Sequence, residues 1–212
     1  IRSTSGWILV LVWTVGALLR FFQLDLRPLH SDEGGNYWFI KEVLERGIYP
    51  YSHENYHGPL FFYAAAVPVI WFGYTAVTIR LFAALCGALI PVIPLLLLKD
   101  LGRRTVLAAA ALLAVSPSLV FYSRYSIHEI PFVLAGLFFM AVFYRWLAEG
   151  YRRDLYLAAA SAVVLIALKE TFVFTGVGAL IAALLTFKPA DLIDLVKKQR
   201  REIGYAIFAG VI

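Results

Sequence analysis

The stretch AVTIRLFAALCGALIPVIPLLLL, residues 76–98, decides the fold class, because it carries a single charged residue, Arg80, over a run long enough to cross a bilayer. A membrane-spanning helix needs about 17–25 predominantly apolar residues. Similar runs recur along the 212-residue chain, which is 61% hydrophobic and only 16% charged. This composition lies far outside the range of soluble domains. We therefore predict an all-α, polytopic integral membrane protein.

The apolar runs predict one transmembrane domain over residues 1–212, with about six full spans and the start of a seventh near Gly204. The expected spans are 6–22, 76–98, 105–122, 130–147, 151–168 and 171–187. The first run resembles a signal-peptide core, but no small-residue cleavage site follows it, so we expect an uncleaved span. Because the sequence begins without methionine and stops inside an apolar run, we expect it to be the N-terminal part of a longer protein.

The segment 59–73, PLFFYAAAVPVIWFG, is apolar but short for a crossing, and a proline interrupts it. If it stays on one surface, the loops at 99–104, 145–154 and 188–202 share the side of the N-terminus. That side then holds 12 of the 19 Lys and Arg residues. Because positive residues concentrate in cytoplasmic loops, we predict a multi-pass protein of the cell (plasma) membrane with a cytoplasmic N-terminus. The outer loop at 23–75 is then expected to contain juxtamembrane helices.

The net charge of +5 belongs to the loops between the spans. It therefore reflects membrane topology, and we expect the lipid bilayer as a partner and no nucleic acid. The single cysteine, Cys86, lies inside an apolar run, which excludes an intrachain disulfide and a thiolate metal site. The basic amphipathic stretch at 188–203 is expected on the cytoplasmic surface beside anionic lipid.

With this topology the outer face collects eight of the 14 carboxylates and all four histidines, which are His30, His53, His57 and His128. Its densest cluster is HSDEGGNYWF, residues 30–39. A helix is predicted there, because apolar residues repeat at helical spacing over 37–44 and Gly47 is suited to end it. Ser31 or Asp32 is the expected N-cap, where backbone N–H groups would keep Asp32 ionised.

Two further helix starts are expected on the outer face, at HGPLFFY (57–63) and RYSIHEIPF (124–132). The unpaired N–H groups of helix N-termini are suited to hold a phosphate. Lys169 interrupts apolar sequence at the end of the fifth span, where a lysine is costly unless it meets a carboxylate or an anionic ligand. Alternatively, Lys169 and Glu170 could form a structural ion pair with Arg124.

The other candidates also have ordinary interpretations. Asp32 could serve only as a helix cap, and Glu33 could be a solvated acid. His57 could belong to turn chemistry beside a proline, and His128 and Glu129 could form a polar pair at the membrane interface. The hypothesis of a site rests on the shared sidedness of these residues.

The order of these elements resembles the C-type glycosyltransferase (GT-C) superfamily, and within it the branch of protein O-mannosyltransferases and the lipid A aminoarabinose transferase. The matching stretches are HSDEGGNYW, HGPLFFY, TIRLFAALCGALIPVIPLLLLKDLGRR, AVSPSLVFYSRYSIHE and ALKET. The likeness is closest to the proteins described as flippase-activity-associated, and it covers the N-terminal half of such a member. It implies a GT-C-like helical bundle with juxtamembrane helices in the first outer loop.

The resemblance also implies catalytic residues. Asp32 matches the first-loop acid of the family and would act as general base on an acceptor hydroxyl, with Glu33 beside it as the second carboxylate. Glu129 matches the second-loop acid that positions the acceptor or a metal. No cofactor is required, although Asp32, Glu129 and His128 could hold one divalent cation if they converge.

The implied reaction is inverting transfer of a sugar from a polyprenyl-phosphate donor to a hydroxyl of a protein or glycan acceptor at the extracytoplasmic face. The candidates for binding substrate or phosphate are His57, Arg124, Lys169 and His128. At the position of His57 the aminoarabinose transferases have a lysine that contacts the lipid phosphate. His57 departs from that pattern, and Lys169 or Arg124 could substitute for it. Cations and helix N-termini would stabilise the leaving phosphate.

Two other classes of protein stay open. A non-catalytic accessory subunit of a larger membrane complex would pair its outer-face acids internally, would lack a lipid-phosphate cavity, and would have other membrane subunits as partners. A transporter or flippase would have discontinuous helices that meet at mid-membrane. The polar residues of this sequence lie at one surface, which places the transporter last.

Overall fold

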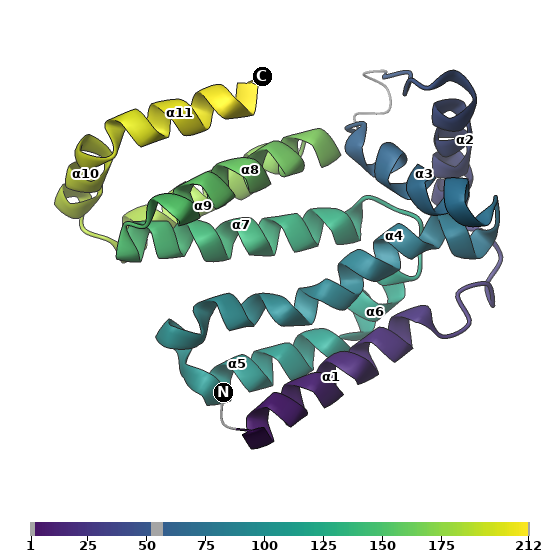
Figure 1. The fold of residues 1–212 in the computed structure, drawn as a ribbon, viewed down its shortest axis with the longest axis horizontal. Coiled ribbons are helices and arrows are strands. Elements are labelled where there is room, and N and C mark those ends of the chain that lie inside the picture. The colour runs from purple at the N-terminus through teal and green to yellow at the C-terminus, as the bar shows by residue number, and fades with distance from the viewer. Residues whose placement is uncertain (1–2, 52–56, 212) are drawn as a thin grey trace.

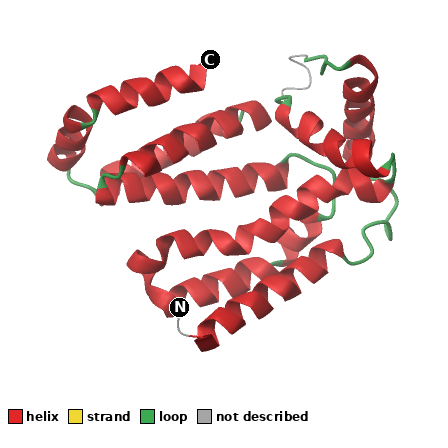
Figure 2. Cartoon of the chain, viewed as in Figure 1, coloured by secondary structure: helices red, strands yellow, loops and turns green. Residues whose placement is uncertain are grey.

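The computed structural model describes residues 3–51 and 57–211, and within these ranges its elements are helices joined by loops and turns (Figure 2). The first half of the chain forms α1 (Ser3–Phe21), α2 (Ser31–Arg46), α3 (Leu60–Phe72), α4 (Ala76–Leu89), the 3-10 helix η1 (Ile90–Leu97) and α5 (Leu98–Val115). The second half forms α6 (Pro117–Ser123), α7 (Glu129–Glu149), α8 (Arg152–Leu168), α9 (Phe172–Thr186), α10 (Pro189–Lys198) and α11 (Arg200–Val211). The predicted all-α class is confirmed.

The long helices run back and forth along one direction and form a bundle with two distinct ends (Figure 1). Helices α2 and α3 gather at one end, which is named the α2–α3 end. The chain turns between α7 and α8, and again around α10, at the opposite end, which is named the α10 end. The start of the described chain also lies toward the α10 end.

The apolar stretch at 76–98 forms α4, continues as η1 and ends at the first residue of α5. Two prolines of η1, Pro91 and Pro94, cannot donate backbone hydrogen bonds, which favours the short 3-10 form. The chain then reverses at Gly102, whose φ of 72° and ψ of 164° suit a residue without a Cβ. As a result α4–η1 and most of α5 lie antiparallel (Figure 1).

The predicted span at 105–122 is interrupted in the structure. Helix α5 ends at Val115, Ser116 adopts a φ of −53° and a ψ of 120°, and α6 starts at Pro117. A residue before proline is pushed out of the helical region by the proline ring, which explains the break.

By length and composition, Ala76–Val115 and Glu129–Glu149 are apolar and long enough to cross a membrane, and α9 with α10 qualifies as a pair bent by 116°. The described part of α1, Gly6–Phe21, and α3 are shorter apolar helices. Since Ala76–Val115 folds back at Gly102, it contains two antiparallel runs. The expected number of six crossings stays a prediction.

Both ends of α3 stay at the α2–α3 end. Before α3, the Gly58 N–H donates to the Leu168 carbonyl at the end of α8 (3.1 Å). After α3, the Tyr74 hydroxyl donates to the Tyr37 carbonyl of α2 (2.5 Å). This position favours the prediction that the segment 59–73 stays on one membrane surface.

The largest buried cluster of the described residues lies at the α2–α3 end and joins five helices, α2, α3, α4, α7 and α8. Ile40 and Val43 of α2 pack in it with Phe61 and Phe62 of α3, next to residues of α7 and α8 such as Leu168. Because these side chains are almost completely buried, α2 and α3 form a packed platform on the bundle. That platform fixes the loops that carry the candidate site.

Candidate active site

Helix α2 begins with a capping box that the sequence analysis did not predict. His30 is the N-cap: its Nδ1 accepts from the Asp32 N–H (3.3 Å), and Glu33 Oε2 accepts from the His30 N–H (3.0 Å). The expectation that Ser31 or Asp32 caps the helix is wrong, because His30 already satisfies these backbone groups. The expected helix and its end at Gly47 (φ 76°) are confirmed.

The Asp32 carboxylate points away from the helix and is 73% exposed. It lies 3.5 Å from His30 Nδ1, but a nitrogen that accepts the Asp32 N–H cannot also donate to the carboxylate. The Ser31 hydroxyl donates to it only weakly, at 3.5 Å. Asp32 therefore has a carboxylate at a helix start that is available to a ligand.

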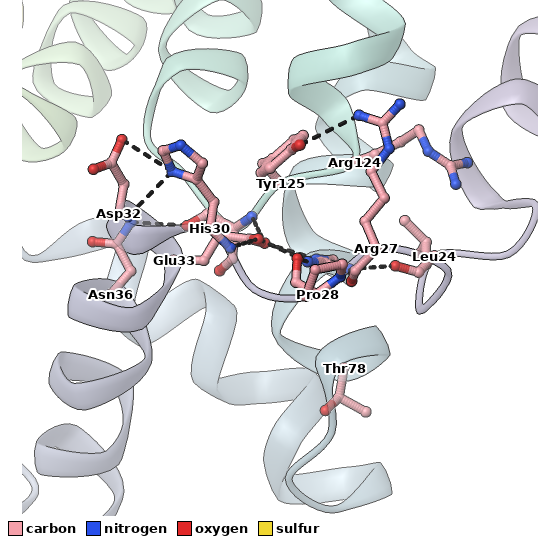
Figure 3. A network of polar contacts seen from close by, with 12 residues as sticks. Leu24, Arg27, Pro28, His30, Asp32, Glu33, Asn36, Thr78, Arg124 and Tyr125 are labelled. Atoms are coloured by element: carbon pink, nitrogen blue, oxygen red, sulfur yellow. Dashed lines mark hydrogen bonds and ion pairs between the residues drawn. The ribbon is translucent and has the colours of Figure 1, made fainter.

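Glu33 points in the opposite direction, into the protein (Figure 3). Its side chain is 0% exposed, and its two oxygens each lie 2.7 Å from a nitrogen of the Arg80 guanidinium. The Ser126 N–H also donates to Oε1 (2.9 Å). The alternative of a solvated Glu33 is therefore wrong. Burial raises the pKa of this carboxyl, but the hydrogen bonds from Arg80 and from the backbone of His30 and Ser126 outweigh it and hold the pKa below its usual value.

Arg80 connects this carboxylate to the loop between α1 and α2. Its remaining N–H groups donate to the carbonyls of Leu24 (2.5 Å), Arg27 (3.1 Å) and Pro28 (3.2 Å). The buried cluster of Glu33 and Arg80 thus ties together the loop between α1 and α2, the start of α2, α4 and the loop before α7. The geometry of this cluster is that of a structural anchor. Glu33 does not line the polar cavity at the α2–α3 end.

A cavity of about 450 Å³ opens at the α2–α3 end, between the starts of α2 and α7 and the end of α8. Its lining residues are Ser31, Asp32, Gly35, Asn36, Phe39, His57, Ile127, His128, Glu129 and Lys169. The structure therefore brings together Asp32, His57, His128, Glu129 and Lys169 of the predicted site. His53, which the sequence analysis also assigned to the outer face, lies outside the described residues.

Lys169 pairs with Glu129 across the cavity. Its Nζ lies 3.0 Å from Glu129 Oε1, and this contact joins the end of α8 to the start of α7. The Lys169 side chain is 18% exposed, whereas that of Glu129 is 47% exposed. The alternative of an ion pair among Lys169, Glu170 and Arg124 is wrong, since Glu170 instead accepts from the Tyr51 hydroxyl. The expectation that Lys169 meets a carboxylate is met by Glu129.

Gly58 allows the chain before α3 to run beside the end of α8. A Cβ at this position would lie 2.1 Å from the Ala167 carbonyl oxygen, so only glycine fits without movement. The close approach forms an antiparallel bridge between His57 and Lys169. It brings two residues far apart in the sequence to one wall of the cavity.

His128 is buried among rings and stays neutral. Its ring centroid lies 4.3 Å from that of His57 and 4.2 Å from that of Phe61. Burial, with repulsion from His57 and Lys169, lowers the pKa of His128 to about 2. Among the residues that the structure describes, its Nε2 finds no hydrogen-bond partner. His128 can therefore offer the cavity a neutral imidazole, but not the positive charge that phosphate binding would use best.

The structure places neither Arg124 nor a metal-ligand set at this cavity. Arg124 caps the end of α1 by donating to the carbonyls of Leu19, Phe22 and Gln23 at 2.6–3.0 Å, and it does not line the cavity. Asp32, Glu129 and His128 share the cavity wall, but over the described ranges no three His, Cys, Asp or Glu side chains are placed to hold one metal ion.

A family model described as dolichyl-phosphate-mannose-protein mannosyltransferase matches residues 56–208, most of the sequence. The chain belongs to this mannosyltransferase family. The match confirms the predicted resemblance to the GT-C superfamily. It also confirms that the resemblance is to the N-terminal half of such a protein. Comparisons with curated proteins and with solved structures give no significant match.

The mannosyltransferase match covers half of the residues that line the cavity, but not Asp32. Glu129 and Lys169 lie inside the matched range, as do His57 and His128. Asp32 lies before this range, and only the geometry of the cavity and the order of the sequence elements connect it to the other residues.

The sequence analysis missed Asn36, which lines the same cavity. Its side-chain amide donates to the Ser126 carbonyl (2.8 Å) and so links α2 to the loop before α7. Asn36 is four residues after Asp32, a spacing that places both on one helix face. This four-residue spacing could have identified Asn36 as a site residue from the sequence.

An apolar cavity of about 460 Å³ lies between α4, η1, α7 and α8. Its lining includes Leu60, Pro131 and Leu168 at the α2–α3 end and Cys86 and Val164 further along the bundle. Leu168 directly precedes Lys169 in the chain. The two cavities therefore approach each other at the end of α8, where Leu168 lines the apolar cavity and Lys169 lines the polar one.

Proposed function

We propose that this chain carries the catalytic cavity of a membrane glycosyltransferase that moves a sugar from a polyprenyl-phosphate donor to an acceptor hydroxyl, with inversion. The observation that carries the proposal is the cavity that holds an exposed carboxylate, Asp32, together with a lysine, Lys169, at the edge of an apolar groove. The three parts match the three parts of the reaction, which are the acceptor hydroxyl, the phosphate and the lipid chain.

The donor would lie across the two cavities. Its hydrocarbon chain fits the apolar groove between α4, α7 and α8, because that groove is lined by apolar side chains. Its phosphate would then meet Lys169 and the N-terminal turns of α2 and α7, whose N–H groups and dipoles favour anions. Lys169 can turn from Glu129 to the phosphate, since their contact lies at a partly exposed surface.

Asp32 would act as general base in a single displacement. As the acceptor oxygen attacks the anomeric carbon, its proton passes to the Asp32 carboxylate, and the bond between that carbon and the phosphate oxygen breaks. The phosphate leaves with the electron pair and is stabilised by Lys169. Carboxylates are weak bases, so positioning of the two substrates would supply much of the rate.

The cavity would face the extracytoplasmic side of the plasma membrane, and the N-terminus the cytoplasm. The support is that the basic loops lie at the α10 end, opposite the cavity (Figure 1), and that cytoplasmic loops are enriched in Lys and Arg. The acceptor would be a protein or a glycan that reaches the cavity from outside the cell.

A second candidate is a non-catalytic accessory subunit with a glycosyltransferase-like fold that works with other membrane subunits. The internal pairing of Glu33 with Arg80 and of Glu129 with Lys169 favours it. The exposure of Asp32 inside a cavity favours the enzyme, since a structural acid would be expected to have a partner.

The experiment is sugar transfer by the full-length protein carrying Asp32→Asn, which removes the charge but keeps the size. Because His30 forms the cap, we expect folding to be unchanged and transfer to fall by about 10²–10⁴. Asp25→Asn is the matched control, since Asp25 is an exposed acid of the loop between α1 and α2 and does not line the cavity. Transfer is measured with and without a chelator, which tests whether a divalent cation takes part. Normal transfer by Asp32→Asn would remove Asp32 as the general base, whereas no transfer by the unmodified full-length protein would support the accessory subunit.

A further inference from the structure

A second groove lies outside the candidate active site, between α1 and α6, and encloses about 890 Å³. Apolar side chains form most of its wall, among them Leu18, Phe22 and Val115. These three are 60%, 67% and 52% exposed. In a membrane protein such outward apolar side chains meet lipid, because hydrocarbon is the solvent of that surface.

Two arginines stand at one end of this groove. The Arg27 guanidinium lies 5.2 Å from the centre of the Phe121 ring, and one of its N–H groups donates to the Tyr125 hydroxyl (3.3 Å). Arg124 lines the same end of the groove. Figure 3 shows the two side chains beside each other, away from Asp32.

The two guanidinium groups are not neutralised by a carboxylate. No ion pair joins Arg27 or Arg124 to an acid among the residues that the structure describes. Burial first, and then repulsion from Arg27 and Arg80, lowers the pKa of Arg124 below its usual value. An anion bound between the two arginines would relieve this repulsion, and a guanidinium binds phosphate oxygens well because its N–H groups form a planar fork.

We propose that this groove binds an anionic glycerophospholipid of the surrounding bilayer. The headgroup phosphate lies against Arg27 and Arg124, and an acyl chain follows the apolar wall between α1 and α6. The phospholipid is favoured over a soluble anion because the charged end continues directly into an apolar wall. The inference goes beyond the proposed function, since no residue of this groove lines the cavity of Asp32.

The test is retention of phosphatidylglycerol by the purified full-length protein in detergent, counted by native mass spectrometry against neutral phosphatidylcholine. We expect a preference for phosphatidylglycerol, and a loss of about fivefold in its affinity in Arg27→Gln, the effect of one cation near a lipid headgroup. Arg27 is chosen because its backbone carbonyl, which Arg80 uses, is unchanged by the substitution. Arg124 is kept because it caps α1.

The matched control is Arg46→Gln, which removes a cation whose side chain is 72% exposed on α2, outside the groove. It should retain phosphatidylglycerol as the unmodified protein does. Equal retention of the two lipids, or equal losses in Arg27→Gln and Arg46→Gln, would overturn the proposal. So would displacement of phosphatidylglycerol by an equimolar polyprenyl phosphate, because the groove would then belong to the donor. Lipid retention is independent of the transfer assay, so the two proposals can fail separately.

Discussion

Asp32 and Glu33 are consecutive residues of α2, and their carboxylates lie in two different surroundings. Asp32 is 73% exposed and lines a cavity that also holds Lys169 and His128. Glu33 is 0% exposed and receives two hydrogen bonds from Arg80 and one each from the backbones of His30 and Ser126. Successive side chains of a helix point about 100° apart, so one turn can present one acid to a ligand and the other to the core.

The difference in surroundings indicates different roles for the two acids. A carboxylate with all its acceptor sites occupied has none left for a substrate, and its value lies in the segments that it ties together. A carboxylate at a helix start with weak partners is free to take a proton or a hydrogen bond. We therefore attribute structure to the cluster of Glu33 and Arg80 and chemistry to the cavity of Asp32.

Breaking the buried cluster should give the largest effect. Arg80→Met leaves Glu33 buried without its cation, and we expect a loss of about 3–5 kcal/mol in the free energy of unfolding. Thermal unfolding in detergent and the yield of folded protein measure it. The double variant Glu33→Leu with Arg80→Met removes both charges and should recover part of the loss. A single variant as stable as the unmodified protein would mean that the pair does not anchor the loops.

Lys169 and Glu129 combine features of both surroundings, because they line the cavity, as Asp32 does, and also form an ion pair, as Glu33 does. If Lys169 holds the donor phosphate, Lys169→Gln should raise the KM for the lipid donor about 10- to 100-fold, the worth of a charged hydrogen bond. Stability should change by at most about 1 kcal/mol, as for other partly exposed pairs.

Glu129→Gln is the matched control, since it breaks the same contact but leaves the cation. It should leave the KM for the donor unchanged or lower it, because Lys169 no longer has a competing carboxylate. Equal KM values in both variants, or equal losses of stability with no change in KM, would assign the pair to structure alone.

The sequence predicted the features of this site that depend on local pattern. Apolar spacing and Gly47 located α2 and its end, and the distribution of cations brought Asp32, Glu129 and Lys169 to one face. The GT-C resemblance, confirmed by the family match over 56–208, supported the same arrangement.

The features that the sequence did not predict depend on contacts between distant residues. The partner of Glu33 is Arg80, 47 positions away, and no local pattern distinguishes a paired acid from a solvated one. Arg124 was a candidate for phosphate binding because it could substitute for the lysine that His57 replaces, but the end of α1 supplies carbonyls that bind its guanidinium. His30 took the cap because an imidazole nitrogen can accept an N–H, although other residues are commoner there.

The smallest predicted effect concerns pH and the buried ring of the cavity wall. His128 has a pKa lowered to about 2 in the folded protein, whereas an unfolded histidine titrates near pH 6.5. Below about pH 6.5 the unfolded state therefore binds more protons than the folded state, and stability falls as the pH drops. The loss should be on the order of 1 kcal/mol per pH unit. Glu33, whose pKa is also lowered, adds to this loss only at pH values below about 4, where an unfolded glutamate titrates.

Thermal unfolding at pH 7.5 and pH 5.5 measures the contribution of His128. His128→Phe keeps an aromatic ring against Phe61 and Phe62 but cannot bind a proton, so its unfolding temperature should fall less between the two pH values than that of the unmodified protein. His30→Gln is the control, because the His30 side chain is 56% exposed and its removal should leave most of the pH dependence in place. If His128→Phe and the unmodified protein lose the same stability on acidification, His128 is accessible to protons. The cavity wall would then be able to supply a positive charge to the phosphate after all.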